Sequence, residues 1–162
     1  MVVKSTGVVP AQLDLGYLGL FLGLRCNELV GARMVAKGFA NVRESHGYVI
    51  QHLIERDRSI TELAERMEVT QQAASKVVAE LLRVGAVEAV IAEDRRSKRI
   101  RLSRRGWRAV KIARKLRSEL EARLVKTLGP GQYAEAKAIL VKCLTELGGL
   151  ERIRSRRIRP AS

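Results

Sequence analysis

The sequence predicts a mainly helical protein that contains one β-hairpin, and three observations lead to this prediction. Apolar residues recur every three or four positions through most of the 162-residue chain, which is the period of a helix with one buried face. Aromatic residues are only 4% of a chain that is 46% hydrophobic, so the core must be mainly aliphatic. The helical period breaks only at residues 87–102, which are typical of two short strands around a charged turn.

The first predicted helix, over residues 11–40, is apolar on more than one side. Leu13, Tyr17, Leu20 and Leu24 lie at helical spacing, with further apolar residues between them. Such a helix requires burial on several faces, which favours a partner chain in a small domain. Four glycines weaken the isolated helix by up to about 1 kcal/mol each but permit close helix contact. These glycines are Gly16, Gly19, Gly23 and Gly31.

Three helix starts follow from local capping signals. Ser45 is a candidate N-cap for a helix over residues 45–55. Ser59 and Glu62 form the S-x-x-E capping box that opens the next helix. Thr70 is placed to cap a further helix, which stops at Gly85.

The remaining elements are the hairpin and two long helices. Strands are expected over residues 87–92 and 99–102, on either side of a charged turn. Ser103 should cap a helix that reaches about residue 128, where a Gly-Pro-Gly sequence breaks it. A last helix is expected over residues 132–147. The chain shows no linker between domains, so one domain is predicted.

This order of elements is that of a winged helix-turn-helix, in which a short capped helix enters the major groove of DNA. A helix about 10 Å wide fits a groove about 12 Å wide. The helix after Thr70 should bury its Ala74 side, where the small Ala73 and Ala74 let it approach the preceding helix closely, and expose a polar face. Gln can bond an adenine edge in two places, and Lys can donate to guanine or to phosphate. The candidate DNA contacts are Thr70, Gln71, Gln72, Ser75 and Lys76.

The tip of the hairpin supplies a second group of candidates. Arg95 and Arg96 lie where a wing could enter the minor groove, whose negative potential attracts arginine. Lys98 and Arg99 are expected to contact the DNA backbone. Asp94 is expected to orient the turn or a neighbouring arginine, because Asp bonds its own turn amides.

Residues 48–106 resemble the MarR family of bacterial regulators, through the segments ITELAERMEVTQQAASKVVAELLRVGAVE and EDRRSKRIRLSRRG. The resemblance implies a single chain over residues 1–162 that forms a homodimer and binds a pseudo-palindromic operator. Its regions would be dimerisation helices in 11–44 and 104–150, a winged helix in 45–103 and a basic tail in 151–162. The family often carries Arg where this chain has Ala89, so a wing salt bridge is expected to be missing or made by another residue.

The resemblance also implies a pocket between the first helices and the long helix after Ser103, for a small aromatic or anionic effector. Tyr17, Phe39, His46 and Tyr48 are the nearby aromatic residues, and the sequence does not place them in it. The resemblance further leaves open a thiol-based redox sensor, although Cys26 is expected to be a buried structural thiol. The operator and the choice between repressor and activator are not encoded in any visible motif, and a repressor is expected.

The charge and composition narrow the function class. A formal net charge of +14 suits a polyanionic partner, since Lys and Arg displace counterions from phosphates. A non-specific nucleoid-type protein is the main alternative to a sequence-specific regulator of double-stranded DNA. No enzyme, cofactor or metal site is expected: His46 and His52 are six residues apart, and His46 is expected at the surface or as a cap. Two cysteines and no visible secretory signal predict a cytoplasmic, nucleoid-associated protein.

Overall fold

The computed structural model describes residues 8–40, 44–91 and 98–154. A short 3₁₀ helix, Pro10–Gln12, precedes the first α-helix. The elements are α1 (Leu15–Ala36), α2 (Glu44–Leu53), α3 (Ile60–Met67), α4 (Gln71–Arg83), β1 (Val87–Ile91), β2 (Lys98–Leu102), α5 (Arg104–Leu128), α6 (Pro130–Glu146) and α7 (Leu150–Arg154). The mainly helical prediction with one two-stranded wing is therefore confirmed. No helix in the described ranges combines the length and apolar character needed to cross a membrane.

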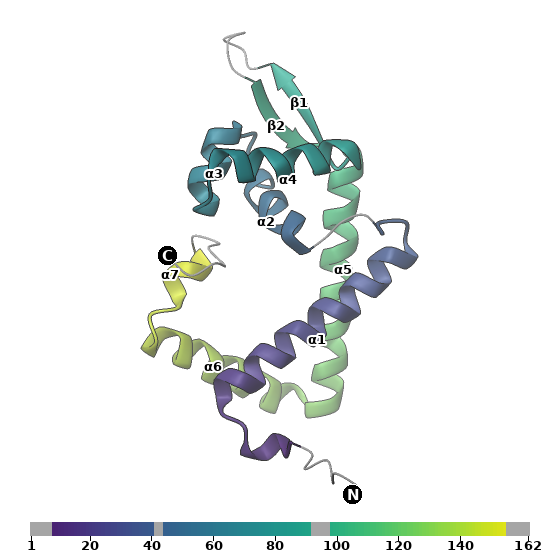
Figure 1. Cartoon of the computed structure of the whole chain (residues 1–162). Coiled ribbons are helices and arrows are strands. Elements are labelled where there is room, and N and C mark those ends of the chain that lie inside the picture. The colour runs from purple at the N-terminus through teal and green to yellow at the C-terminus, as the bar shows by residue number, and fades with distance from the viewer. Residues whose placement is uncertain (1–7, 41–43, 92–97, 155–162) are drawn as a thin grey trace, which may run out of the picture.

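The helices α2, α3 and α4 gather at one end of the molecule with the hairpin projecting from them (Figure 1). The long helix α5 leaves this end, α1 crosses it, and α6 turns back from its far end. The main core lies within the winged part and is aliphatic, as the composition predicts. Its most deeply buried members are Val49, Leu63, Val78, Leu81 and Ile100.

A second, smaller core lies where α1 meets α5. It contains Val30 and Met34 from α1, Phe39 after it, and Ala109 and Leu116 from α5. The long helix thus contributes to both cores and connects them. The rest of α1 has no comparable burial within this chain, since Val30 and Met34 are its only buried residues.

Three of the predicted caps are confirmed. The Ser59 side chain accepts from the Glu62 amide, and the Glu62 carboxylate accepts from the Ser59 amide, which closes the capping box. Thr70 accepts from the Ala73 amide at the start of α4. Ser103 accepts from the Gly106 amide at the start of α5. Each cap satisfies one of the amides that a helix start leaves without a partner.

Several predicted boundaries are wrong by a few residues. The first helix begins at Leu15 rather than residue 11, because Asp14 accepts from the Tyr17 amide and caps it there. Ser45 is not a cap, since α2 already begins at Glu44. The helix predicted from residue 132 begins at Pro130, because proline suits a first helical position, where no N–H is needed.

The two strands of the wing pair antiparallel, with Val87 opposite Leu102 and Ile91 opposite Lys98. The base of this hairpin also pairs with a residue outside the two strands, which the sequence did not predict. The Arg58 amide donates to the Ile100 carbonyl at 3.0 Å, and the Ile100 amide donates back at 2.7 Å. The wing is therefore tied through its backbone to the segment before α3.

The junction between the wing and α5 requires a glycine. The Ser103 hydroxyl donates to the Gly85 carbonyl at 2.6 Å, which draws the start of α5 against the end of α4. A Cβ added at Gly106 would lie 2.0 Å from the Ala86 carbonyl oxygen. The L-S-x-x-G pattern at residues 102–106 therefore encodes a close backbone approach.

Candidate nucleic-acid interface

The turn between α3 and α4 fixes the direction in which α4 leaves. Glu68 ends α3 in the left-handed conformation, at φ 54° and ψ 46°, and the Val69 amide donates to the Ala64 carbonyl. Thr70 then opens α4 within two residues. The two helices thus form a short helix-turn-helix whose second helix has a defined start.

The predicted inner face of α4 is confirmed. Ala74, Val78 and Leu81 are between 0% and 1% exposed, and Val77 packs half-buried against the same core. The sequence also suggested that Ala73 lets α3 and α4 approach closely. That detail is wrong, because Ala73 is exposed and only Ala74 lies in the contact.

The opposite face of α4 carries the predicted DNA-binding residues. Thr70, Gln71, Gln72, Ser75 and Lys76 are all exposed on the first two turns of the helix. The Gln71 amide nitrogen donates weakly to the Thr61 hydroxyl at 3.4 Å. The structure therefore brings these polar side chains together on one open surface, behind which the core holds the helix in place.

The predicted wing residues are divided between described and undescribed positions. Asp94, Arg95 and Arg96 lie outside the described residues. Lys98 is exposed at the start of β2. Arg99 is half-buried, and its guanidinium donates to the Asp57 carbonyl at 3.1 Å and to Glu62 at 3.4 Å.

The Glu62 carboxylate is the centre of a small charged cluster. It pairs with Arg56 at 2.9 Å and with Arg99 at 3.4 Å, besides accepting from the Ser59 amide. The Ser59 amide lowers the pKa of Glu62 below its usual value of 4.5, and Arg56 and Arg99 lower it further against the opposing effect of burial. The capping box of α3 therefore depends on an ionised carboxylate that also anchors the wing.

The wing carries a salt bridge despite the departure at Ala89. Glu88 and Arg101 are opposite each other in the strand register, and their side chains pair at 2.7 Å. Both side chains are about half exposed. We expected the wing salt bridge to be missing or to be made by another residue, and the second outcome holds because Glu88 and Arg101 make it.

Two buried polar side chains, one beside α4 and one under the wing, were not predicted. His46 was expected at the surface or as a cap, yet it is 1% exposed, and its Nε2 lies 3.0 Å from the Glu80 carboxylate on α4. The helical spacing of His46, Val49 and Leu53 was the available signal, because these residues share the buried face of α2. The expectation was wrong because the Glu80 carboxylate gives a buried imidazole a polar partner.

Arg58 is the second of these groups and is also 1% exposed. Its Nε donates to the His52 carbonyl at 2.9 Å, and one terminal nitrogen donates to Glu55 at 2.8 Å. Burial lowers the pKa of this guanidinium, and Arg66 and Arg56 add to the effect. No pattern in the sequence distinguishes Arg58 from the neighbouring surface arginines, since only the tertiary fold places it under the wing.

Comparison with known proteins identifies this region. Residues 40–97 match the sequence model of the MarR family. Over these residues the chain is similar to the MarR family. No curated protein matches the sequence.

Solved structures extend the likeness to the flanking helices. MepR from Staphylococcus aureus, a transcription regulator of the multidrug efflux pump MepA, superposes with a TM-score of 0.67 at 19% identity, covering 83% of this chain and 99% of its own. A point mutant of MepR bound to an oligodeoxyribonucleotide gives 0.61 at 18% identity, covering 84% and 99%. The YusO protein of Bacillus subtilis gives 0.66 at 20% identity, covering 85% and 99%. At these identities the likeness shows that the chain shares its fold with them.

Proposed function

We propose that this chain is a transcription regulator that binds double-stranded DNA in a sequence-specific way, as a homodimer, and represses by occupying its operator. The observation that carries the proposal is the exposed polar face of α4, with Gln71, Gln72, Ser75 and Lys76 on two successive turns. Residues of these types bond base edges in the major groove. The MepR mutant solved with an oligodeoxyribonucleotide has the same fold, which supports DNA as the partner.

The α4 face suits base reading better than it suits a purely electrostatic contact. Two amides and one hydroxyl accompany a single cation, so most of its groups form directional hydrogen bonds and carry no charge. The capped N-terminus of α4 adds amide dipoles that attract phosphate. A nucleoid-type protein would need only the charge, and therefore explains less of this face.

Selection from a random pool of duplexes tests this proposal. The bound sequences should converge on two related half-sites whose centres are about one helical turn apart. Competition in fluorescence anisotropy should then favour the selected duplex over a random one by a factor of about 10³ or more. Equal competition by the two duplexes would support the nucleoid-type alternative and refute sequence reading.

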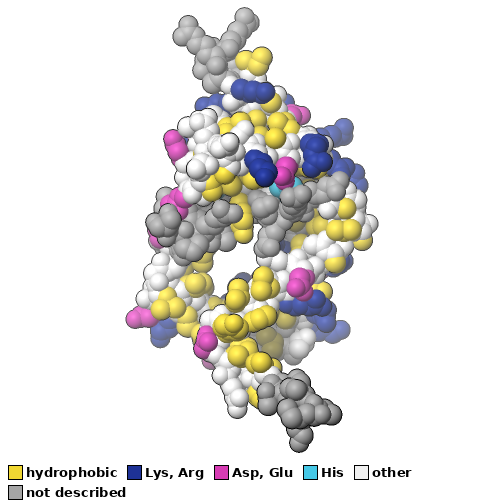
Figure 2. Space-filling model, viewed as in Figure 1, with side chains coloured by type: hydrophobic (Ala, Val, Ile, Leu, Met, Phe, Trp, Pro, Cys, Tyr) yellow, Lys and Arg dark blue, Asp and Glu magenta, His cyan; other side chains and the backbone are white. Residues whose placement is uncertain are grey.

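The dimer proposal rests on apolar surface that one chain leaves uncovered. Figure 2 shows hydrophobic side chains on the near face of α1, and large contiguous patches of this kind usually mark interfaces. The exposed apolar residues of α1 are Leu15, Tyr17, Leu18, Leu20, Phe21, Leu22, Leu24 and Val35. Those of α6 and its C-cap are Ile139, Leu140, Val141, Leu144 and Leu147.

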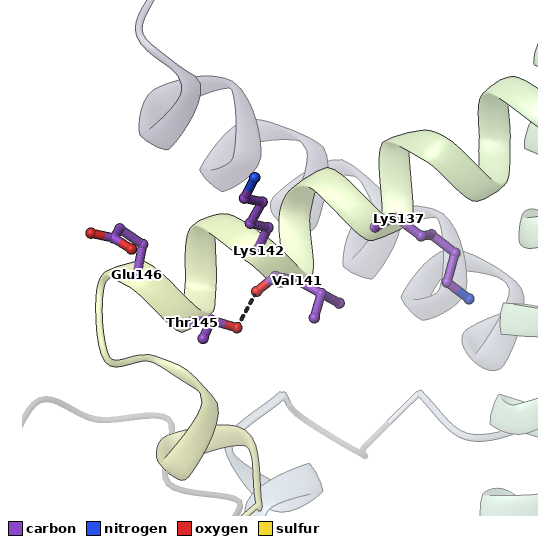
Figure 3. Close-up of a pocket in the computed structure, with 6 residues that line it drawn as sticks. Lys137, Val141, Lys142, Thr145 and Glu146 are labelled. Carbon is purple, nitrogen blue, oxygen red and sulfur yellow. Dashed lines mark hydrogen bonds between the residues drawn. The ribbon is translucent and has the colours of Figure 1, made fainter.

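A shallow hollow lies on α6 beside Val141, one of these exposed apolar residues (Figure 3). It measures about 630 Å³ and is lined by Lys137, Ala138, Val141, Lys142, Thr145 and Glu146. The Thr145 hydroxyl donates to the Val141 carbonyl at 2.8 Å, so its proton is not available to a ligand. Because one helix supplies every lining residue, this hollow suits a side chain of a second copy better than a small molecule.

The hollow between α1 and α5 favours a narrower class of effector than the aromatic or anionic molecules that the resemblance implied. A hollow of about 100 Å³ between α1 and α5 contains the Arg33–Glu119 pair at 2.6 Å and Arg123. Among the described residues, its lining contains no aromatic side chain. Tyr17 and Phe21 form a tilted ring pair on α1, and Phe39 lies under Arg105. A small anion that replaces Glu119 on Arg33 is the effector this site favours. Release of the DNA by millimolar benzoate but not by benzamide would support an anionic effector.

A further inference from the structure

The outer face of α5 has a charge pattern that the winged helix does not explain. The first fifteen residues of α5, 104–118, contain seven Lys or Arg and no Asp or Glu. The buried residues Gly106, Ala109, Val110 and Leu116 define the inner face. Most of the cations lie on the opposite side of the helix, since 3.6 residues complete each turn.

The cations of α5 fall into two groups. Arg105 donates to the Gly38 carbonyl at 2.9 Å and covers the Phe39 ring, and Arg117 donates to Asn27 at 2.9 Å. These two side chains support the α1–α5 contact. The remaining five form no ion pair with any residue in the described ranges and are exposed: Arg104, Arg108, Lys111, Arg114 and Lys115.

Trp107 lies in the middle of this group and is 46% exposed. It is the only tryptophan of the chain. Its indole N–H is a donor without acceptor capacity, so it can bond phosphate oxygens as the neighbouring cations can. We call Arg104, Trp107, Arg108, Lys111, Arg114 and Lys115 together the α5 basic face.

The spacing along the α5 basic face matches the charge density of duplex DNA. Arg104 and Lys115 are separated by eleven residues, or about 16 Å along the axis at about 1.5 Å per residue. Five cations in this length give about one per 3–4 Å, and one DNA strand carries one phosphate per about 3.4 Å of axis. Figure 2 shows Lys and Arg side chains at the edge of the molecule where α4 ends and α5 begins.

The direction of α5 sets which part of the DNA it could meet. The helix runs away from the α4 end of the molecule (Figure 1), so a straight duplex on α4 does not also follow α5. A duplex that followed both helices would have to bend sharply, which costs elastic free energy. A separate duplex segment reaches the face without this cost.

We propose that the α5 basic face binds the phosphate backbone of a second duplex, so that the protein bridges two DNA segments. The proposal goes beyond the operator contact, which needs only α4 and the wing. A membrane surface is a poorer partner, because Trp107 is the only large apolar side chain on this face. The contact is electrostatic and therefore independent of sequence.

A capture assay tests the bridge directly. Beads that carry a random-sequence 30-base-pair duplex should retain a second, fluorescent duplex only when the protein is present. The variant Arg108→Ala/Lys111→Ala should lose two phosphate contacts. For the second duplex, the dependence of log affinity on log salt concentration should therefore become less steep by about 2. Its affinity for a single duplex in anisotropy should change less than twofold. Lys37→Ala/Lys126→Ala removes the same charge from exposed positions outside the α5 basic face and should keep capture unchanged.

Trp107 provides an independent readout, because its fluorescence comes from this face alone. Acrylamide quenching of Trp107 should decrease when duplex is added, including in Lys76→Ala, which impairs the α4 site. Single-duplex binding without capture or Trp107 protection would overturn the bridge and leave the proposed function intact. Protection of Trp107 by anionic phospholipid vesicles but not by duplex would overturn it as well. Absence of any duplex binding would instead refute the proposed function.

Discussion

Replacement of Gly106 by alanine tests the tight junction between the wing and α5. The added Cβ would lie 2.0 Å from the Ala86 carbonyl oxygen, 3.1 Å from the Ala86 carbonyl carbon and 3.3 Å from Leu102 Cδ2. Two of these atoms belong to the backbone, which cannot rotate away as a side chain can. Overpacking of this kind costs about 1–3 kcal/mol, and the better helix propensity of alanine returns up to about 1 kcal/mol.

We therefore expect Gly106→Ala to lower the free energy of unfolding by about 1–2 kcal/mol. With a urea m-value of about 2 kcal/mol per molar, the midpoint should fall by about 0.5–1 M. Circular dichroism at one fixed protomer concentration measures it, since dimer formation makes stability concentration-dependent. Gly47→Ala is the matched control, because Gly47 lies within α2 and a Cβ there meets nothing within 4 Å. A midpoint for Gly106→Ala equal to or above that of Gly47→Ala would refute the packing argument.

Three further predictions concern the capping box, the groove and the dimer. The folded state holds the pKa of Glu62 below 4.5, so the ionised carboxylate contributes fully to the free energy of unfolding above that pH. This contribution is lost as the pH falls through the lowered pKa. Acid unfolding curves of Glu62→Gln should therefore show a smaller loss of stability over this pH range. Lys76→Ala should weaken DNA binding without unfolding the chain. In anisotropy, the slope of log affinity against log salt concentration should become less steep by about 1. An unchanged slope would contradict a contact of Lys76 with phosphate or base. Leu20→Glu should convert a dimer to a monomer in light scattering, whereas a dimer that persists would exclude this part of α1 from the interface.

The sequence predicted the helices, the hairpin and the exposed face of α4, because these depend on local periodicity and caps. The spacing of Ala74, Val78 and Leu81 leaves Gln72 and Lys76 on the opposite side of a helix, whatever the rest of the chain does. The capping residues likewise act within three positions of themselves. The ends of several helices were wrong where Asp14 and Pro130 compete with other local signals, and the short helix α7 at the start of the expected basic tail was not predicted.

The contacts that orient the site could not be predicted, since they join residues far apart in the chain. The Arg99–Glu62 pair spans 37 positions and the His46–Glu80 pair spans 34. Arg58 has the same local sequence environment as the exposed Arg56, and only the arrival of β2 buries it. Periodicity reports which face of a helix is buried and not which element covers it.

These long-range contacts give the wing and α4 a common support. β2 is held at Ile100 by the backbone of Arg58 and at Arg99 by Glu62, whose carboxylate also closes the cap of α3. The helix α3 in turn packs on α4 through Leu63 and Ala64. Because Arg99 is engaged in this support and Arg101 pairs with Glu88, the proposed phosphate contact of the described wing residues falls to the exposed Lys98. The orientation of the wing relative to α4 thus depends on the Glu62 cluster as well as on the Arg58 backbone, and a change in the cluster should alter both proposed DNA contacts together.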